Sequence, residues 1–85
     1  MFDIDWMPKA LRQLRKIREQ TIRAELVDAA ETLRDFPNCP NVKALVNHRY
    51  GYRLRVGRYR ILFDVYNVVN IIAIQEVKKR NERTY

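Results

Sequence analysis

Two runs of alternating residues on either side of a Gly-Arg pair constrain the fold of this chain more than any other feature. Residues 52–56 and 59–65 each place an apolar residue at every second position, which is the pattern of a β-strand with one buried face. Gly57 fits the first central position of a two-residue type II′ turn, where glycine adopts a positive φ without steric cost. The sequence therefore predicts a β-hairpin in which Arg55 lies opposite Arg60.

The predicted register sorts the side chains of the hairpin onto two faces. The apolar partners all fall on one face, and this agreement supports the register. These pairs are Val56 with Tyr59, Leu54 with Ile61, and Tyr52 with Phe63. The opposite face gathers Arg53, Arg55 and Arg60.

Arginines directly opposite each other are unfavourable in a sheet. Like charges in such a pair are destabilising by a few tenths of a kcal/mol or more, so folding alone gives no reason to pair Arg55 with Arg60. A phosphate group between them would reverse the sign of the interaction, because the planar guanidinium fork binds phosphate oxygens in pairs. Two other interpretations stay open: the arginines extend into water, or they pair with Asp64 and Glu76.

The net charge lies in the second half of the chain. Residues 1–42 carry seven basic and seven acidic side chains, whereas residues 43–85 carry ten basic and three acidic ones. The whole formal charge of +7 therefore belongs to the half that contains the hairpin. Such asymmetry indicates a polyanionic partner, usually nucleic acid, although a basic surface can also serve solubility alone.

The first half of the chain has the pattern of a strand followed by helix. Residues 2–6 alternate apolar and polar side chains, and Pro8 fits a first helical position. Apolar residues then recur at helical spacing as far as Phe36. They form either a helical hairpin broken near Glu19 and Gln20 or one long helix. The two prolines that follow end the segment, because proline lacks the backbone donor.

The remaining segments complete the predicted architecture. Residues 68–77 form a nearly continuous run rich in β-branched residues, which suits a central strand of undetermined facing, and residues 78–85 form a polar tail. The order β-α-α-β-β-β predicts an α+β fold, with an antiparallel-type sheet of about four strands and two N-terminal helices on one face. We expect a single domain, 1–85, with its site on an open face.

Composition argues against several classes of protein and site. No apolar run approaches the ~18 residues of a membrane span, and the acidic, alternating N-terminus is unlike a signal peptide, so we expect a cytoplasmic protein. Cys39 and His48 are the only cysteine and the only histidine. They exclude an internal disulfide and a Cys/His metal site, and we expect no metal or other cofactor.

Other residues could extend the basic face. Tyrosines are interleaved with the arginines, and exposed ones could stack on nucleobases; they are Tyr50, Tyr52, Tyr59 and Tyr66. Tyr52 and Tyr59 fall on the predicted core face and are expected to pack there instead. If the polar tail folds back, Arg80 and Tyr85 could reach the arginine face. His48 is expected to be a loop or surface residue without a catalytic role.

Two segments carry a resemblance to a known family. The run YRLRVGRYRILF at residues 52–63, with the aliphatic strand after it, and the run KRNERTY at residues 79–85 resemble the RelE/ParE superfamily of toxins. The opening strand with Trp6 and the basic helix with Ala10, Leu11 and Leu14 are similar to the family as well. The resemblance covers essentially the whole chain and is most specific in the C-terminal segment. It implies a toxin of a type II toxin–antitoxin pair, neutralised by a cognate antitoxin that wraps around it.

The resemblance to RelE-like members implies cleavage of mRNA on the ribosome without a metal. In that reaction the ribose 2′-OH attacks the adjacent phosphate and leaves a 2′,3′-cyclic phosphate and a 5′-OH. Arg53 and Arg55 match two basic residues of the first hairpin strand, and Arg60 matches an arginine that holds the scissile phosphate. Arg80 matches a tail arginine that assists the leaving group, and Tyr85 matches a C-terminal tyrosine that orients the nucleotide. Further RNA contacts are expected from Arg58, Lys78, Lys79 and Arg83.

The resemblance leaves the general base and the exact function open. RelE itself has a lysine at the position of Arg53, and that lysine could act as the general base. Arginine cannot readily lose its proton, so Arg53 does not replace the lysine in that role. Tyr85 or His48 could take the proton, or catalysis could rest on orientation and charge. Two alternative functions are a ParE-like inhibitor of gyrase, a branch that generally lacks the basic set, and a non-catalytic RNA-binding toxin homologue. A toxin–antitoxin heterotetramer or larger assembly is one possible state.

Overall fold

Two helices and five strands make up residues 1–80, the part of the chain that the computed structural model describes. The helical elements are α1 (Pro8–Arg15), α2 (Gln20–Glu31) and the 3-10 turn η1 (Thr32–Asp35). The strands are β1 (Asp3–Trp6), β2 (Val42–Ala44), β3 (Tyr52–Val56), β4 (Tyr59–Tyr66) and β5 (Ile71–Lys79). A second 3-10 turn, η2 (Asn67–Val69), joins β4 to β5.

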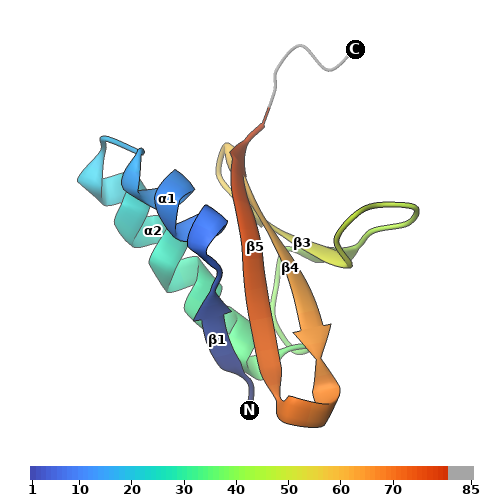
Figure 1. Ribbon diagram of the computed structural model, residues 1–85. Coiled ribbons are helices and arrows are strands. Elements are labelled where there is room, and N and C mark those ends of the chain that lie inside the picture. The colour runs from blue at the N-terminus through green and yellow to red at the C-terminus, as the bar shows by residue number, and fades with distance from the viewer. Residues whose placement is uncertain (81–85) are drawn as a thin grey trace.

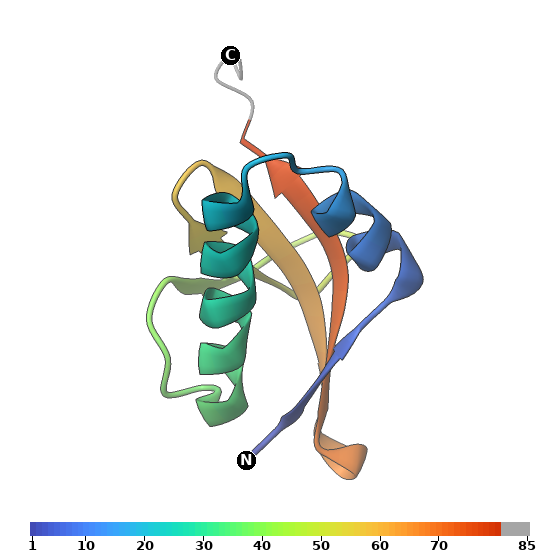
Figure 2. The ribbon, with the colours of Figure 1, turned by 90° about the vertical axis from the view of Figure 1, so that its left-hand side faces the viewer.

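The elements form two layers. Both helices lie on one side of the sheet, and the loop between β2 and β3 projects from the other side (Figure 1). Viewed from the helical side, α2 crosses in front of the sheet (Figure 2). Helical spacing brings Leu26, Ala30 and Leu33 to the inner side of this layer, where each is 0% exposed. The core is therefore closed on one face of the sheet, and the other face is left for a site.

The sheet corrects the prediction of four antiparallel strands. It has five strands in the order β1-β5-β4-β3-β2. The additional strand, β2, has three residues, which is too short for a period of two to be recognised in the sequence. β1 runs parallel to β5, with Asp3 opposite Ile71. Parallel pairing needs a long connection, and here both helices and the strands β2, β3 and β4 lie between the two strands in the chain. The sheet is therefore mixed, and the α+β class is confirmed.

The central hairpin has the predicted register. Arg55 lies opposite Arg60, and the apolar pairs face the core. Gly57 has a φ of 56°, and no positive φ occurs at Arg58, as a type II′ turn requires. Phe63 is 0% exposed on the core face of β4. The arginines of β3 and β4 are consequently directed away from the core.

A β-bulge in β5 decides which of its side chains face the core. The register of β5 against β4 shifts by one residue at Gln75, which is how a bulge reverses the alternation of a strand. Because of this shift, Ile74 and Val77 both pack in the core although they lie three positions apart. The same shift turns Glu76 and Lys78 to the opposite face, which is the face of the arginines.

The helical segment is a hairpin of two helices, one of the two alternatives that the sequence allowed. α1 ends at Arg15, earlier than the predicted break. β1 pairs with β5 only as far as Ile74. Beyond that residue, α1 lies along the edge of β5. The Gln13 side chain accepts a hydrogen bond from the backbone N–H of Val77 at 2.7 Å. α1 thereby satisfies an edge donor that β1 does not reach.

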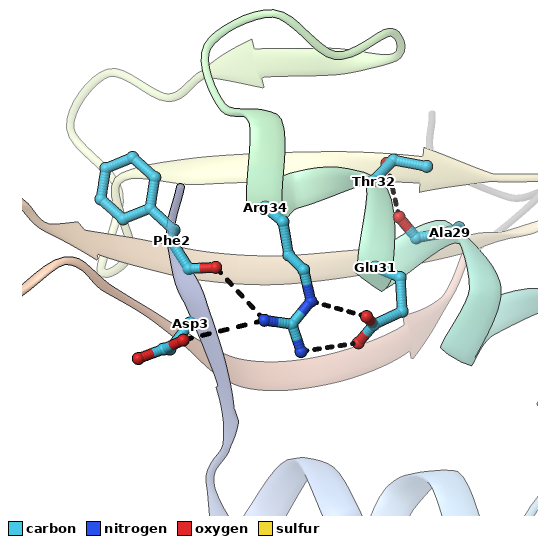
Figure 3. A network of polar contacts seen from close by, with 6 residues as sticks. All are labelled: Phe2, Asp3, Ala29, Glu31, Thr32 and Arg34. Atoms are coloured by element: carbon cyan, nitrogen blue, oxygen red, sulfur yellow. Dashed lines mark hydrogen bonds and ion pairs between the residues drawn. The ribbon is translucent and has the colours of Figure 1, made fainter.

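Arg34 joins the N-terminal strand to the end of the helical layer (Figure 3). Its guanidinium donates hydrogen bonds to the Glu31 carboxylate at 2.6 Å and to the Phe2 carbonyl at 3.4 Å. The Asp3 carboxylate lies 3.8 Å away. The hydrogen bond with Glu31 raises the pKa of Arg34. Arg34 is thus paired with carboxylates, whereas within residues 1–80 no ion pair joins Arg53, Arg55 or Arg60 to a carboxylate.

Candidate nucleic-acid interface

Four arginines line one pocket of about 120 Å³ on the face of the sheet opposite the helices. Arg53 and Arg55 come from β3, and Arg60 comes from β4. Arg80 directly follows β5, and its backbone N–H donates a hydrogen bond to the Arg58 carbonyl at 2.6 Å. That bond continues the antiparallel pairing past the end of β5. The sheet therefore brings four of the predicted site residues into one pocket, which we call the arginine pocket.

The electrostatics of the arginine pocket show strain among like charges. Burial, followed by the charges of the other three arginines, lowers the pKa of Arg53. Within residues 1–80, no ion pair joins any arginine of the pocket to a carboxylate. An anion with several oxygens would relieve the repulsion, because each guanidinium presents planar donors that match two such oxygens. The arrangement could therefore bind an anion such as a phosphate group.

The acidic residues on this face bind other groups. Asp64 accepts hydrogen bonds from the backbone N–H of Gly51 at 2.7 Å and from the Gln75 side chain at 3.3 Å. Glu76 forms an ion pair with Lys9 of α1 at 3.3 Å. The alternative in which Asp64 and Glu76 neutralise the arginines is therefore wrong.

Glu76 is held in its charged form by its neighbours. It is 7% exposed, and burial alone would raise the pKa of its carboxyl. Hydrogen bonds from Tyr50 and Lys9 outweigh the effect of burial, and the pKa of Glu76 is lowered. The pKa of Tyr50 is raised by burial and by its hydrogen bond to the same carboxylate. This cluster joins α1 and the β2–β3 loop to the sheet beside the basic residues.

Replacing Glu76 with glutamine should destabilise the protein by about 1–3 kcal/mol at pH 7, because Lys9 and Tyr50 lose a charged partner. A lowered pKa means that the stabilisation is present above the ordinary value of 4.5 and is lost as the pH falls through the folded-state value. Thermal unfolding between pH 3 and pH 7 should therefore show the native chain and Glu76→Gln converging in acid. Glu25→Gln, at an exposed position of α2, serves as the control, and a constant difference at every pH would contradict the assignment.

A second pocket, of about 270 Å³, shares Arg53 and Arg60 with the arginine pocket. Its other lining residues are Leu45, His48, Leu62, Lys78 and Lys79. His48 lies in the loop between β2 and β3, as predicted. The prediction did not place it near the arginines, because its position depends on how the loop crosses the sheet. A short polar segment before an alternating strand was the only signal in the sequence.

The other predicted RNA contacts are divided among different surfaces. Lys78 and Lys79 line the second pocket, beside the arginines. Arg58, in the hairpin turn, lines a different pocket next to α2. Arg83 and Tyr85 lie outside the described residues, so their predicted contacts with RNA stay predictions.

The four tyrosines interleaved with the arginines do not line the arginine pocket. Tyr52 and Tyr59 pack against the core, as predicted. Tyr66 ends β4 at the opposite end of the strand from Arg60 and is 49% exposed. Tyr50 supports Glu76 instead. The described part of the site is therefore cationic and contains no tyrosine platform next to the four arginines.

Comparison with protein families identifies this chain. Residues 4–83 match the family described as the ParE toxin of the type II toxin–antitoxin system parDE. The chain belongs to the ParE toxin family. A comparison with curated protein sequences found no match to this toxin. Within residues 1–80, neither helix of the toxin has the length and apolar character needed to cross a membrane.

Solved structures of RelE toxins share the fold of this ParE-family toxin. The isolated RelE toxin of E. coli aligns with a TM-score of 0.80 at 19% identity, over 99% of this chain and 89% of that chain. The RelBE2 toxin–antitoxin complex of Mycobacterium tuberculosis aligns with a TM-score of 0.77 at 22% identity, over 93% and 98%. The archaeal RelE–RelB complex of Pyrococcus horikoshii gives 0.76 at 18%, over 95% and 97%. At these identities the likeness establishes the fold.

Proposed function

We propose that this toxin is a RelE-like, ribosome-dependent endoribonuclease that cleaves mRNA at the arginine pocket. The observation that carries the proposal is the pocket itself, where four guanidinium groups meet with no carboxylate among the described lining residues. Their mutual repulsion lowers the stability of the sheet. A phosphate group of an RNA strand would remove this repulsion on binding, and its attraction to the guanidinium groups would contribute to the affinity for RNA.

The proposed reaction is transesterification within the RNA strand. The ribose 2′-oxygen forms a bond to the adjacent phosphorus, and the bond from phosphorus to the 5′-oxygen of the next nucleotide breaks. The 2′-hydroxyl loses its proton and the departing 5′-oxygen gains one, leaving a 2′,3′-cyclic phosphate and a 5′-OH. Negative charge grows on the phosphate oxygens in the transition state, and fixed cationic donors stabilise it most at that point.

Each site residue has a proposed role in that step. Arg60 holds the scissile phosphate, with Arg53 and Arg55 on the neighbouring strand orienting it and the 2′-hydroxyl. Arg80 assists the departing 5′-oxygen. Tyr85, which is not among the described residues, is proposed to orient the nucleotide.

Additional affinity and the protein partner are also proposals. Cations around the pocket would attract the RNA backbone without reading its sequence; they are Arg58, Lys78, Lys79 and Arg83. The structural likeness to RelE toxins solved with their RelB partners supports a cognate antitoxin that binds this toxin. The cytoplasm, where ribosomes and mRNA occur, is the proposed location.

Inhibition of gyrase is the second candidate function, because the matching family is described by its ParE toxins. A gyrase inhibitor acts by binding protein and does not require a phosphate pocket. The cationic cluster of Arg53, Arg55 and Arg60, which forms no ion pair with a carboxylate within residues 1–80, favours RNA as the target.

Translation of a defined mRNA in a purified system, followed by primer extension, tests the proposal. Added toxin should produce discrete cuts within the reading frame, with 5′-OH and 2′,3′-cyclic phosphate ends. A parallel supercoiling assay with purified gyrase tests the second candidate. Intact mRNA together with inhibited supercoiling would reject the RNase in favour of gyrase.

RNA binding by the isolated toxin should depend steeply on salt. Single-stranded RNA releases about 0.7 counterions per phosphate contact, so three or four arginine–phosphate contacts predict an affinity roughly 15- to 50-fold lower at 200 mM than at 50 mM salt. Fluorescence anisotropy with a 2′-O-methyl oligonucleotide, which has no 2′-hydroxyl to react, measures this. A change of less than about twofold over that range would contradict phosphate contacts as the source of affinity.

A further inference from the structure

The β2–β3 loop forms a wall of the second pocket, and its position is fixed by several contacts. Gly51 donates its backbone N–H to Asp64 at 2.7 Å, and its carbonyl accepts a hydrogen bond from the backbone N–H of Leu45 at 2.9 Å. Asn47 adopts a φ of 53° within the loop, a conformation that asparagine tolerates better than most residues. The loop is therefore held in place before any ligand binds.

The His48 ring is held within this loop by a hydrogen bond from the backbone of Tyr50. Its Nδ1 accepts a hydrogen bond from the backbone N–H of Tyr50 at 3.1 Å. A neutral imidazole carries one proton, so one ring nitrogen donates and the other accepts. Because Nδ1 accepts here, the proton of the neutral ring is on Nε2. The ring therefore has no unoccupied lone pair with which to take a proton. This arrangement argues against His48 as the general base and leaves its flat ring and its Nε2–H available to a ligand.

The floor of the second pocket is apolar, unlike the arginine pocket. Leu62 lies on the same face as the arginines, opposite Arg53 in the register, and is 4% exposed. Leu45 of the loop lines the pocket with it. At about 270 Å³ the pocket has more than twice the volume of the arginine pocket. His48 and Leu62 give this pocket one aromatic and one aliphatic surface, which suit a flat, partly apolar group. The other lining residues include the cations Arg53, Arg60, Lys78 and Lys79, which suit the phosphate attached to such a group.

We propose that the second pocket binds one nucleobase of the RNA strand, stacked against the His48 ring and over Leu62. This inference rests on the proposed function, because the shared residues Arg53 and Arg60 would hold the phosphate that is linked to the same nucleotide. Single-stranded RNA is commonly bound in this way, with backbone phosphates on cations and splayed bases on rings. The site would then fix the strand at two points and position the reacting phosphate.

A double-mutant cycle between the toxin and the RNA tests the proposal. The RNA is a short single strand with 2′-O-methyl ribose throughout, compared with versions that carry one abasic nucleotide at each position in turn. The protein change is His48→Asn, which keeps an acceptor for the Tyr50 N–H but removes the ring. For native toxin, one abasic position should weaken binding about tenfold, as expected for one stacked base. His48→Asn should weaken the intact RNA by a similar factor and make that abasic position nearly silent.

The outcomes separate this inference from the proposed function. If every abasic RNA binds the native toxin as well as the intact RNA does, the nucleobase site does not exist. If His48→Asn weakens intact and abasic RNA equally, the histidine acts only on the loop, and the inference is overturned. Primer extension in the translation system is run alongside. Cleavage by native toxin with no coupling between His48 and any base would reject the nucleobase site alone, whereas absent cleavage would reject the proposed function.

Discussion

Replacing Arg60 with glutamine is expected to lower the rate of mRNA cleavage by about 10²-fold or more while leaving the protein at least as stable as the native chain. Removing one preorganised donor to a developing oxyanion typically costs 10²–10³-fold. The stability should hold or rise by a few tenths of a kcal/mol, because the like charge opposite Arg55 is gone. Glutamine keeps much of the side-chain length, so little packing is lost.

Primer extension and thermal unfolding on the same preparations measure the two effects together. Arg18→Gln, at an exposed position between the helices, removes the same charge outside the pocket and should leave the cleavage rate within about twofold, as befits a surface change away from the site. Arg60→Lys should recover only part of the rate, because lysine offers a point charge where arginine offers a fork. Full cleavage by Arg60→Gln would reject the arginine pocket as the reacting site. A large loss of stability would show that Arg60 serves the fold.

The opposition of Arg55 and Arg60 could be predicted because its causes are local. A glycine at the turn and alternation on both sides determine which residues pair, and the wrong register would bury arginines. The location of Tyr52 and Tyr59 in the core followed from the same pattern. The helical hairpin was one of two alternatives, because no glycine or proline marks the turn before Gln20.

The arrival of Arg80 in the same pocket depends on long-range structure. The bulge at Gln75 reverses the alternation of β5. The position of a bulge cannot be predicted from an aliphatic run of residues. Without the reversal, Glu76 and Lys78 would share the core face with Ile74. The polar tail was also expected to begin at Lys78, whereas pairing with β4 extends the strand to Lys79.

The partners of the acidic residues were likewise set by tertiary contacts. Asp64 binds the backbone of Gly51, thirteen residues away, and Glu76 binds Lys9 at the other end of the chain. The same loop contacts bring His48 over the sheet. Because β2 has three residues, no periodicity in the sequence located the hairpin that carries this loop. The hairpin arginines of the arginine pocket were thus foreseeable from the sequence, whereas the strand pairing that brings Arg80 to them and the pocket beside them were not.

Replacing Phe63 with alanine should remove about 3–5 kcal/mol from the free energy of unfolding, the largest effect on stability that we expect from a single substitution. Phe63 is 0% exposed, stacks on Tyr52 with ring centroids 5.4 Å apart and meets Phe36 edge-on at 6.1 Å. Such aromatic pairs add to the area that each ring buries. A domain of this size has roughly 4–13 kcal/mol of stability in total, so this loss is a large share of it.

Urea denaturation of the purified variants measures the effect, with Val68→Ala as the control. Val68 is 99% exposed in the η2 turn, and its truncation should change stability by less than about 0.5 kcal/mol. Phe63→Leu keeps most of the volume and should cost less than alanine.

Because Phe63 and the arginines occupy opposite faces of the sheet, Phe63→Leu should reduce cleavage only in proportion to the unfolded fraction. A loss below about 1 kcal/mol for Phe63→Ala would mean that the core does not depend on this aromatic cluster. Cleavage lost by a folded Phe63→Leu protein would mean that core packing also positions the arginines.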